Sequence, residues 1–246
     1  MCGRFVSKRS AADLATLFDA DDFSGDVLRP SFNVAPMQRA PVVRMSKRAG
    51  GRVVDAARWG LVPSWSKDPG AGARMINARV ETVASSPAYR AAFARRRCLV
   101  PADGWYEWRK LPGGGKQPYF MTAPQDGGPL VFAGLWERWG QGEEESLLTC
   151  TVLTRPALGR LETVHDRMPL LLTPDRHGAW LGETDGGNAD DILAAPDAAL
   201  LAELEIRPVG KAVGNVRNDG PHLIESVPEL VEDPPKPPAD EHPSLF

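Results

Sequence analysis

The sequence has no apolar stretch that approaches the length of a membrane span, and its first twenty residues lack the apolar core of a signal peptide. Cysteine is scarce, with three in 246 residues and no CxxC or Cys/His spacing typical of a zinc site. The phosphate-binding patterns GxxxxGK[ST] and GxGxxG are absent. We therefore expect a cytoplasmic protein with reduced thiols that works without a metal or other cofactor.

Charge is distributed unevenly along the chain. The net charge is −3, but residues 1–110 contain 19 Lys and Arg against 10 Asp and Glu, whereas residues 111–246 contain 10 against 22. Such segregation points to an anionic ligand that approaches one face. The run Arg95–Arg97 is interpreted more simply, as the solvated end of a helix that begins at Ser86 and Pro87, because cations in a last turn complement the helix dipole.

Extended stretches dominate the chain. Composition is that of a globular protein, with 42% hydrophobic and 25% charged residues. The loops 111–118 and 123–129 are typical of hairpin turns, which favour neighbouring antiparallel strands. We expect a single α+β domain with a mainly antiparallel, barrel-like β core and short flanking helices. Strands are predicted at 41–45, 52–62, 97–110, 119–122, 130–139, 146–154 and 204–209.

Helices are predicted in four further places. Ser10 is a typical N-cap, and the helix after it is expected to bury Leu14, Leu17 and Phe18 on one face. Thr173-Pro174-Asp175 opens another, and residues 188–195 and 197–204 form two more. No linker divides the chain. We predict one catalytic domain over residues 2–228 and a Pro-rich, acidic, disordered tail over residues 229–246.

Cys2 is the most informative single residue. Once Met1 is removed, Cys2 carries an α-amine and a thiol on adjacent carbons, and both have usable reactive fractions near pH 7. The amine can form a Schiff base with an aldehyde, and the thiolate can then close a thiazolidine ring. Alone, a Met-Cys start is more simply a frayed and idle terminus. Cys98 and Cys150 lie in apolar strand-like runs and are expected to be buried, reduced core residues.

Several polar residues lie in surroundings where structure alone does not require them. Glu107 stands between Tyr106 and Trp108, so burial is expected to raise its pKa toward the range of a general acid or base. The alternative is an edge-strand glutamate that faces water. His165, in the motif HDRMP, is a candidate proton carrier, although a lone histidine is more often structural.

The motif INARVET suggests one polar strand face. Asn77, Arg79 and Glu81 alternate, so on a strand all three side chains point to the same side. That side is either a wall of a site or the solvated face of a sheet.

Seven motifs in the same order resemble the SOS-response-associated peptidase family, whose members crosslink to abasic sites in single-stranded DNA. The motifs are MCGRF, FNVAP, WGLVPSW, INARVET, ADGWYEW, HDRMP and AVGNVRND. The resemblance implies that Cys2 attacks the aldehyde of a ring-opened abasic sugar. It implies that Asn77 orients the Cys2 amine and the sugar, and that Glu107 and His165 transfer protons. The enzymatic activity implied is abasic-site crosslinking, with self-cleaving peptidase and lyase-type reactions as further expectations.

The resemblance also implies a partner, which is single-stranded DNA that contains abasic sites. Arg4, Arg79 and Arg167 match positions that hold DNA phosphates, and Trp65 and Trp108 are candidates for stacking on flanking bases, with a core position as the alternative, especially for Trp65. Ser66 stands where the family often has a second aromatic residue, which puts stacking on that side in doubt. We expect a monomer that binds no membrane and no metal and lies on the nucleoid when bound to DNA.

Three alternative functions remain open at this stage. Glutamine amidotransferases and other N-terminal-nucleophile hydrolases also begin Met-Cys-Gly, and there Cys2 would attack an amide carbonyl. A Cys2/His165 protease, including one that removes its own Met1, fits the family's name. The third alternative is a protein that binds single-stranded DNA without a covalent bond. The sequence has no glutamine-binding signature that would support an amidotransferase, and Glu107 has no obvious task in that reaction.

Overall fold

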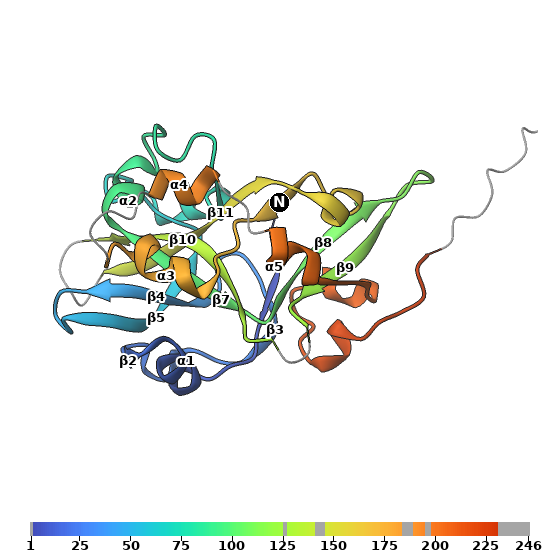
Figure 1. Cartoon of the computed structure of the whole chain (residues 1–246), viewed down its shortest axis with the longest axis horizontal. Coiled ribbons are helices and arrows are strands. Elements are labelled where there is room, and N and C mark those ends of the chain that lie inside the picture. Colours follow the sequence, from blue (N-terminus) through green and yellow to red (C-terminus); the bar gives the residue numbers. More distant parts are fainter. Residues whose placement is uncertain (1, 125–126, 141–145, 184–188, 195–197, 231–246) are drawn as a thin grey trace, which may run out of the picture.

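The computed structural model describes residues 2–124, 127–140, 146–183, 189–194 and 198–230, and these form two sheets with short helices around them (Figure 1). The larger sheet has the strand order β12-β11-β10-β7-β4-β5-β2 and the smaller one β13-β9-β8-β1-β3. The larger sheet contains β12 (Arg167–Pro169), β11 (Leu147–Pro156), β10 (Leu130–Trp139), β7 (Arg97–Ala102), β4 (Arg39–Ser46), β5 (Gly51–Trp59) and β2 (Ala20–Asp22). The smaller sheet contains β13 (Glu205–Pro208), β9 (Lys116–Thr122), β8 (Gly104–Lys110), β1 (Phe5–Ser7) and β3 (Ser31–Val34).

Strands of the larger sheet close into a ring. β5 pairs in parallel with β11, where Arg58 lies opposite Thr149 and Trp59 opposite Cys150. Antiparallel pairs join β5 to β4, β4 to β7, β7 to β10 and β10 to β11, which completes a circuit of five strands. The expected α+β domain with a mainly antiparallel, barrel-like core is therefore confirmed.

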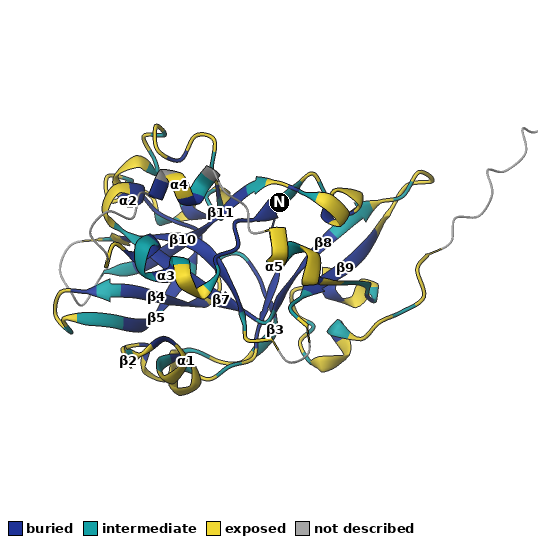
Figure 2. Cartoon of the chain, viewed as in Figure 1, coloured by how far each residue is buried: buried dark blue, intermediate teal, exposed yellow. Residues whose placement is uncertain are grey.

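The core lies inside this ring and between the two sheets. β1 runs through the middle of the molecule, with β4, β5 and β10 on one side and β8 and β9 on the other (Figure 1). Phe5 on β1 packs edge-on against Trp59 and Phe132, with ring centroids 5.1 and 6.2 Å apart. Buried residues follow these central strands, whereas the helices and loops at the periphery are exposed (Figure 2). The first residues of the chain are thus held in the core.

The predicted strand 97–110 is wrong in one respect, because it is two strands that belong to different sheets. β7 ends at Ala102 and β8 begins at Gly104, whose φ of +157° favours glycine. A Cβ atom at residue 104 would collide with the Phe120 ring and the Met121 carbonyl. The chain therefore changes sheets at a position where only glycine fits.

The predicted hairpin at 123–129 is also wrong, because this connection joins β9 of the smaller sheet to β10 of the larger sheet.

The helices agree with expectation except at two points. α1 (Ala11–Phe18) begins after Ser10, which caps it, and buries Leu14 and Phe18, but Leu17 is 50% exposed and lies off the packed face. α2 (Arg90–Arg95) begins later than predicted, because the Ser86 carbonyl accepts from residues 89 and 90 in a turn. α3 (Pro174–Leu181), α4 (Ala189–Ala194) and α5 (Ala198–Glu203) fall where the sequence predicts them.

The predicted tail is described only in its first two residues. The Tyr119 hydroxyl donates to Glu229, and the Leu230 amide donates to Gln117 Oε1 over 3.2 Å, so both residues contact β9. Residues 231–246 lie outside the described residues, and the disordered tail stays a prediction.

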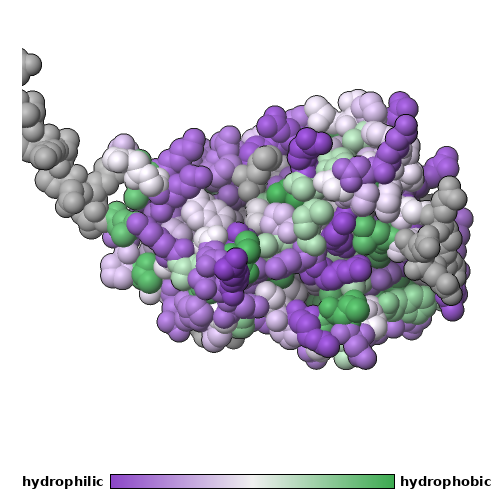
Figure 3. All heavy atoms as spheres, turned by 180° about the vertical axis from the view of Figure 1, so that it is seen from behind, coloured by the Kyte–Doolittle hydropathy of each residue, from purple (hydrophilic) through white to green (hydrophobic). Residues whose placement is uncertain are grey.

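Among the described helices, none combines the length and the apolar character needed to cross a membrane. Hydrophilic residues predominate on the face seen in Figure 3.

Candidate active site

Cys2 is held against the edge of the larger sheet by Asn77. The short strand β6 (Asn77–Arg79) pairs in parallel with β11, with Asn77 opposite Val152. Asn77 Nδ2 donates to the Cys2 carbonyl over 2.7 Å, and its Oδ1 atom is buried with no hydrogen-bond partner among the described residues. The Asn77 amide therefore fixes the backbone of the candidate nucleophile and offers an acceptor beside it.

Backbone pairing brings Cys2 next to Glu107. Phe5 lies opposite Trp105 in the antiparallel β1–β8 pair, and the Tyr106 amide donates to the Arg4 carbonyl over 2.9 Å. Because the two segments run antiparallel, the residues before Arg4 lie alongside Glu107. Cys2 is fully buried, and burial raises the pKa of its thiol well above the ordinary range, with the Glu107 charge as the next cause. The Cys2 thiol is therefore protonated at neutral pH.

Glu107 and His165 form the titratable pair of the site. His165 Nε2 lies 3.9 Å from Glu107 Oε2, and Glu107 is only 3% exposed. Burial raises the pKa of Glu107 to about 7, whereas burial lowers the pKa of His165. The edge-strand alternative for Glu107 is thus not what the structure shows: its carboxyl group is buried and titrates near neutral pH.

A backbone contact orients the His165 ring. The Arg167 amide donates to His165 Nδ1 over 2.9 Å, which leaves the proton of a neutral ring on Nε2, toward Glu107. Asp166 Oδ1 also lies 2.7 Å from Nδ1, a contact that requires Nδ1 to be protonated. In the neutral ring the backbone contact sets the tautomer, because an unprotonated Nδ1 accepts from the Arg167 amide and cannot donate to the Asp166 carboxylate. Asp166 becomes a partner when His165 is protonated.

The three predicted phosphate-binding arginines lie in different environments. Arg79 is exposed, and its side chain makes no ion pair or hydrogen bond with a described residue. Arg167 binds both carboxylate oxygens of Glu81 and the Thr154 carbonyl, and this hydrogen bond from Arg167 lowers the pKa of Glu81. Arg4 is 9% exposed. Arg79 alone is free to bind a phosphate without giving up a contact, and the phosphate roles of all three stay predictions.

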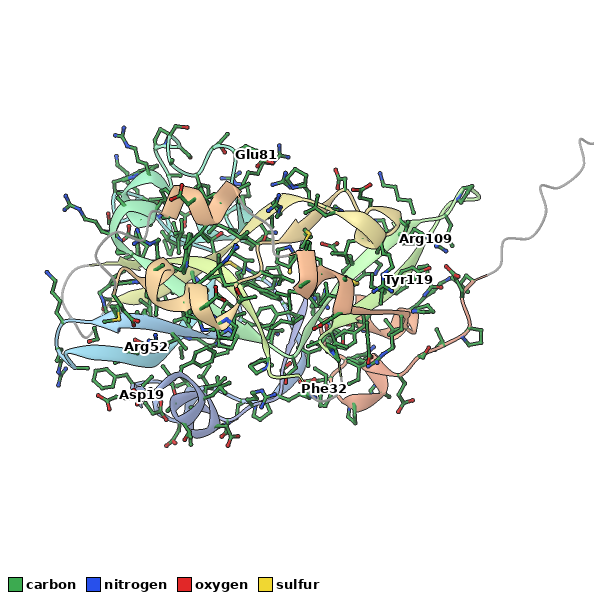
Figure 4. The ribbon with its side chains drawn as sticks, viewed as in Figure 1. Asp19, Phe32, Arg52, Glu81, Arg109 and Tyr119 are labelled. Carbon is green, nitrogen blue, oxygen red and sulfur yellow. The ribbon has the colours of Figure 1, made fainter. Side chains whose placement is uncertain are left out.

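Glu81 lies beyond the end of β6, so only part of the predicted polar strand face exists. β6 stops at Arg79, and Glu81 falls in the following turn. Figure 4 shows Glu81 at the edge of the molecule, on the side opposite to Asp19 and Arg52. Its role in the structure is to pair with Arg167 on β12.

Arg4 is held by Asn33 and by a backbone carbonyl from the second half of the chain. Its Nη1 atom donates to Asn33 Oδ1 and to the Val213 carbonyl, each over 2.8 Å. Asn33 Nδ2 in turn donates to the Asn218 carbonyl over 2.7 Å. These contacts join the motifs MCGRF, FNVAP and AVGNVRND in the folded protein.

The two candidate stacking tryptophans differ in exposure. Trp65 is 69% exposed on the loop after β5, so the core alternative for Trp65 does not hold. Trp108 is half-buried and packs against the cluster that contains Val6 and Tyr106. Ser66 has its own task, because its carbonyl accepts from Trp139 Nε1 over 2.7 Å and so anchors the loop that presents Trp65.

The remaining cysteines belong to the core, as expected. Cys98 and Cys150 are buried and free, and burial raises the pKa of both thiols. Within the described part of the chain, no three His, Cys, Asp or Glu side chains are arranged to hold a metal ion.

Comparison with known proteins now places this arrangement in a family. The sequence model of the SOS response associated peptidase (SRAP) family matches residues 1–216. The chain belongs to this family.

Three similar proteins are each described as an abasic site processing protein. The abasic site processing protein YoqW of Bacillus subtilis is 35% identical over 92% of this chain and 100% of its own length. YedK of Escherichia coli, of the same description, is 34% identical over 92% of this chain and 100% of its length. HMCES of Gallus gallus, again an abasic site processing protein, is 30% identical over 91% of this chain and 77% of its length.

Solved structures share the fold. A protein from Bacteroides thetaiotaomicron superposes with a TM-score of 0.77 at 20% identity, over 92% of this chain and all of its own. A protein from Bordetella bronchiseptica superposes with a TM-score of 0.69 at 25% identity, over 85% of this chain and all of its own.

Sequence reasoning missed three residues that hold the candidate site in place through hydrogen bonds. The Tyr89 hydroxyl donates to the Asn77 carbonyl over 3.2 Å, and Thr154 receives Arg167 through its carbonyl. Trp139 fixes the loop of Trp65. None of these residues stands in a motif with its own chemical signature, because each acts through one hydrogen bond across the fold. The sequence alone therefore does not distinguish them from ordinary core residues.

Proposed function

We propose that this protein captures abasic sites in single-stranded DNA covalently through Cys2, after removal of Met1. The observation that carries the proposal is the placement of Cys2, which Asn77 holds by a 2.7 Å hydrogen bond beside buried Glu107 and its partly buried neighbour His165. Aldehyde capture needs an amine, a thiol and a proton carrier together, and this site supplies all three. The names of the YoqW and YedK relatives support the abasic site as the lesion.

The proposed reaction forms two bonds in succession. The α-amine of Cys2 attacks the aldehyde carbon of the ring-opened sugar, and loss of one water gives an imine. The Cys2 sulfur then adds to the imine carbon while its proton passes to the nitrogen, which closes a thiazolidine ring. Overall, one carbon–nitrogen and one carbon–sulfur bond form and one water leaves. Within one residue the sulfur is held next to the imine carbon, which favours closure strongly.

Glu107 has a pKa that suits both steps of this reaction. A carboxyl group with a pKa of about 7 is present in both protonation states at neutral pH, so it can protonate the departing hydroxyl and later accept the thiol proton. The Nε2 proton of neutral His165 faces Glu107 and supports its carboxylate between the two steps. Asn77 Oδ1 is positioned to accept from the attacking amine or from a sugar hydroxyl.

The substrate is single-stranded for a physical reason. In a duplex, the neighbouring stacked bases shield an abasic site, whereas on a single strand the missing base leaves an open gap and no pairing energy to break. Exposed Trp65 suits stacking on a flanking base, and exposed Arg79 suits a phosphate. Such contacts bind without reading base identity, so the capture depends on the lesion rather than on the sequence.

The protease alternative fits this site less well. A cysteine protease needs a thiol with a lowered pKa, stabilised as thiolate by a cationic histidine. Here burial and the Glu107 charge raise the pKa of the Cys2 thiol, and burial lowers the pKa of His165. A protonated thiol is a poor nucleophile toward an amide. It is adequate toward an imine, which is far more electrophilic and lies within the same residue.

Intact mass spectrometry tests the proposal. The purified protein should have a mass that lacks one methionine residue, and mixing it with an abasic oligonucleotide should give an adduct that equals the sum of both masses minus one water. The adduct should form without added reductant. An oligonucleotide whose abasic sugar is replaced by tetrahydrofuran, which has no aldehyde, is the matched control. A protein that binds the abasic strand and gives no adduct would contradict covalent capture.

A further inference from the structure

A second hollow on the surface lies away from Cys2 and is lined by cations. It has a volume of about 700 Å³ and is formed by the end of the β4–β5 hairpin, Phe23 after β2, the end of α2 and the end of β10. The hairpin end and α2 lie at one extremity of the molecule, whereas β1 lies centrally and β8 lies on the other side of β1 (Figure 1). We call this hollow the basic groove, and its cationic residues are Arg44, Lys47, Arg48, Arg95, Arg96 and Arg138.

The floor of the basic groove is rigid. Arg44 is 7% exposed, and its guanidinium group lies 2.7 Å from the Asp55 carboxylate and 4.9 Å from the centroid of the Trp136 ring. Arg96 pairs with Glu137 over 2.6 Å. Neither Asp55 nor Glu137 lines the groove, and no other acidic residue of the described part of the chain lines it. The floor therefore offers fixed donors and an aromatic ring, and its two cations are already neutralised.

The rim carries the excess charge. Lys47, Arg48, Arg95 and Arg138 make no ion pair with a residue that the structure describes, and all four are exposed. The helix dipole of α2 accounts for Arg95 alone, as the basic residue of its last turn. Four like charges around one hollow repel one another, so folding does not require them there. Their arrangement favours an anion that spans the groove.

The residue types select the kind of anion. Five of the six cations are arginines, whose planar forks match phosphate oxygens, and the aromatic residues Phe23 and Trp136 line the same hollow. Phe23 is 41% exposed and available for stacking. Successive phosphates with bases between them satisfy both features, because each nucleotide supplies one charge and one flat ring. An acidic peptide uses the cations and leaves the exposed Phe23 ring without a partner.

We propose that the basic groove is a second binding site for single-stranded DNA, which holds undamaged strand at a distance from the Cys2 site. The choice of DNA as occupant rests on the proposed function. A strand that reaches both sites must be long, so the groove adds affinity for long strands and leaves the chemistry at Cys2 unchanged. It also accounts for part of the positive charge in residues 1–110, which the Cys2 site uses only in part.

The test uses two readouts on the whole protein. The first is equilibrium binding of an undamaged single strand of about 24 nucleotides, measured by fluorescence anisotropy at several salt concentrations; the second is the crosslinking rate of a saturating abasic strand of about 6 nucleotides. Arg48→Glu and Arg95→Glu should each weaken binding of the long strand by about tenfold at low salt and reduce the salt slope by at least about 0.7. Both should crosslink the short strand at the wild-type rate.

Arg29→Glu is the matched control, because Arg29 is exposed and contacts only the carbonyl of its neighbour Leu28 among the described residues. The proposal is overturned if Arg29→Glu weakens long-strand binding as much as the groove variants do, or if the groove variants bind the long strand normally. It is also overturned if a polyglutamate peptide binds as tightly as DNA and depends equally on Arg48. Failure of the short strand to crosslink with wild type would contradict the proposed function and leave the binding readout intact.

Discussion

His165 Nε2 lies 3.9 Å from Glu107 Oε2, across the gap between the loop before β12 and strand β8. Burial raises the pKa of Glu107 to about 7 and lowers the pKa of His165, so it favours the uncharged form of both side chains. A carboxyl group with a pKa near the working pH is present in both protonation states, so it can donate a proton in one step and accept one in the next. Glu107 can therefore carry a proton beside Cys2 at neutral pH because it is buried; a glutamate side chain in water is ionised at this pH.

Replacing Glu107 by Gln should separate chemistry from binding. The variant keeps the size and a hydrogen-bonding head group but cannot accept a proton, so crosslinking should slow by about 10²-fold or more, the usual scale for a positioned acid or base. Binding of undamaged single-stranded DNA should be unchanged. Single-turnover crosslinking measured by gel provides the rate. Glu205→Gln, on an exposed strand position, is the control, and unchanged kinetics in Glu107→Gln would remove Glu107 from the mechanism.

The same carboxyl group predicts a pH dependence of stability. Glu107 has a raised pKa of about 7 in the folded protein against about 4.5 in the unfolded chain, so the folded state binds more protons between these values. The stability due to protonated Glu107 is therefore fully present below about pH 4.5 and is lost as pH rises through about 7. Relative to Glu107→Gln, wild type should lose up to about 3 kcal/mol over that range. Urea unfolding of both proteins from pH 5 to 8 measures this difference, and two parallel curves would contradict the assignment.

Arg79 and Arg167 should respond differently to truncation. Arg79→Ala removes an exposed cation without a described partner, so it should weaken binding of all single strands similarly and reduce the salt slope by about 0.7. Arg167→Ala breaks the contacts with Glu81 and the Thr154 carbonyl, so it should also lower the melting temperature. Binding at several salt concentrations together with thermal melting distinguishes them. An unchanged slope with a collapsed crosslinking rate in Arg79→Ala would show that Arg79 organises the site instead.

Trp65 offers a test of stacking that is free of folding effects. Because Trp65 is 69% exposed, Trp65→Ala should leave thermal stability nearly unchanged while it weakens single-strand binding by about 1–3 kcal/mol. Trp108→Ala is the comparison, since half-buried Trp108 packs on the core and its loss should lower stability as well. Equal affinities of wild type and Trp65→Ala would assign Trp65 to no DNA contact.

The sequence predicts the fold where local signals agree with the final packing. Ser10 caps α1 as its pattern indicates, and Cys98 and Cys150 are buried as their apolar neighbours indicate. It fails where a contact distant in sequence decides. The exposure of Leu17 and the break at Gly104 depend on neighbours in other elements, and period alone does not reveal them.

The candidate site shows the same division. Motifs select Cys2, Asn77, Glu107 and His165 as candidate site residues, and the structure places each of them near another of the set. Motifs do not reveal how each residue is held. The contacts of Arg4 with Asn33 and Val213 join positions more than 25 and 200 residues apart, which no local pattern encodes.

Covalent capture through both nucleophiles of Cys2 is tested most directly by Cys2→Ser. The variant keeps an α-amine that can form an imine but has no sulfur to close the ring, so its adduct should persist only when borohydride reduces the imine. Wild-type protein should give the same adduct mass with or without quenching by a competing amine, and without any reductant. Intact mass spectrometry of both proteins after mixing with an abasic single strand makes the comparison. A stable, unreduced adduct from Cys2→Ser would contradict the account.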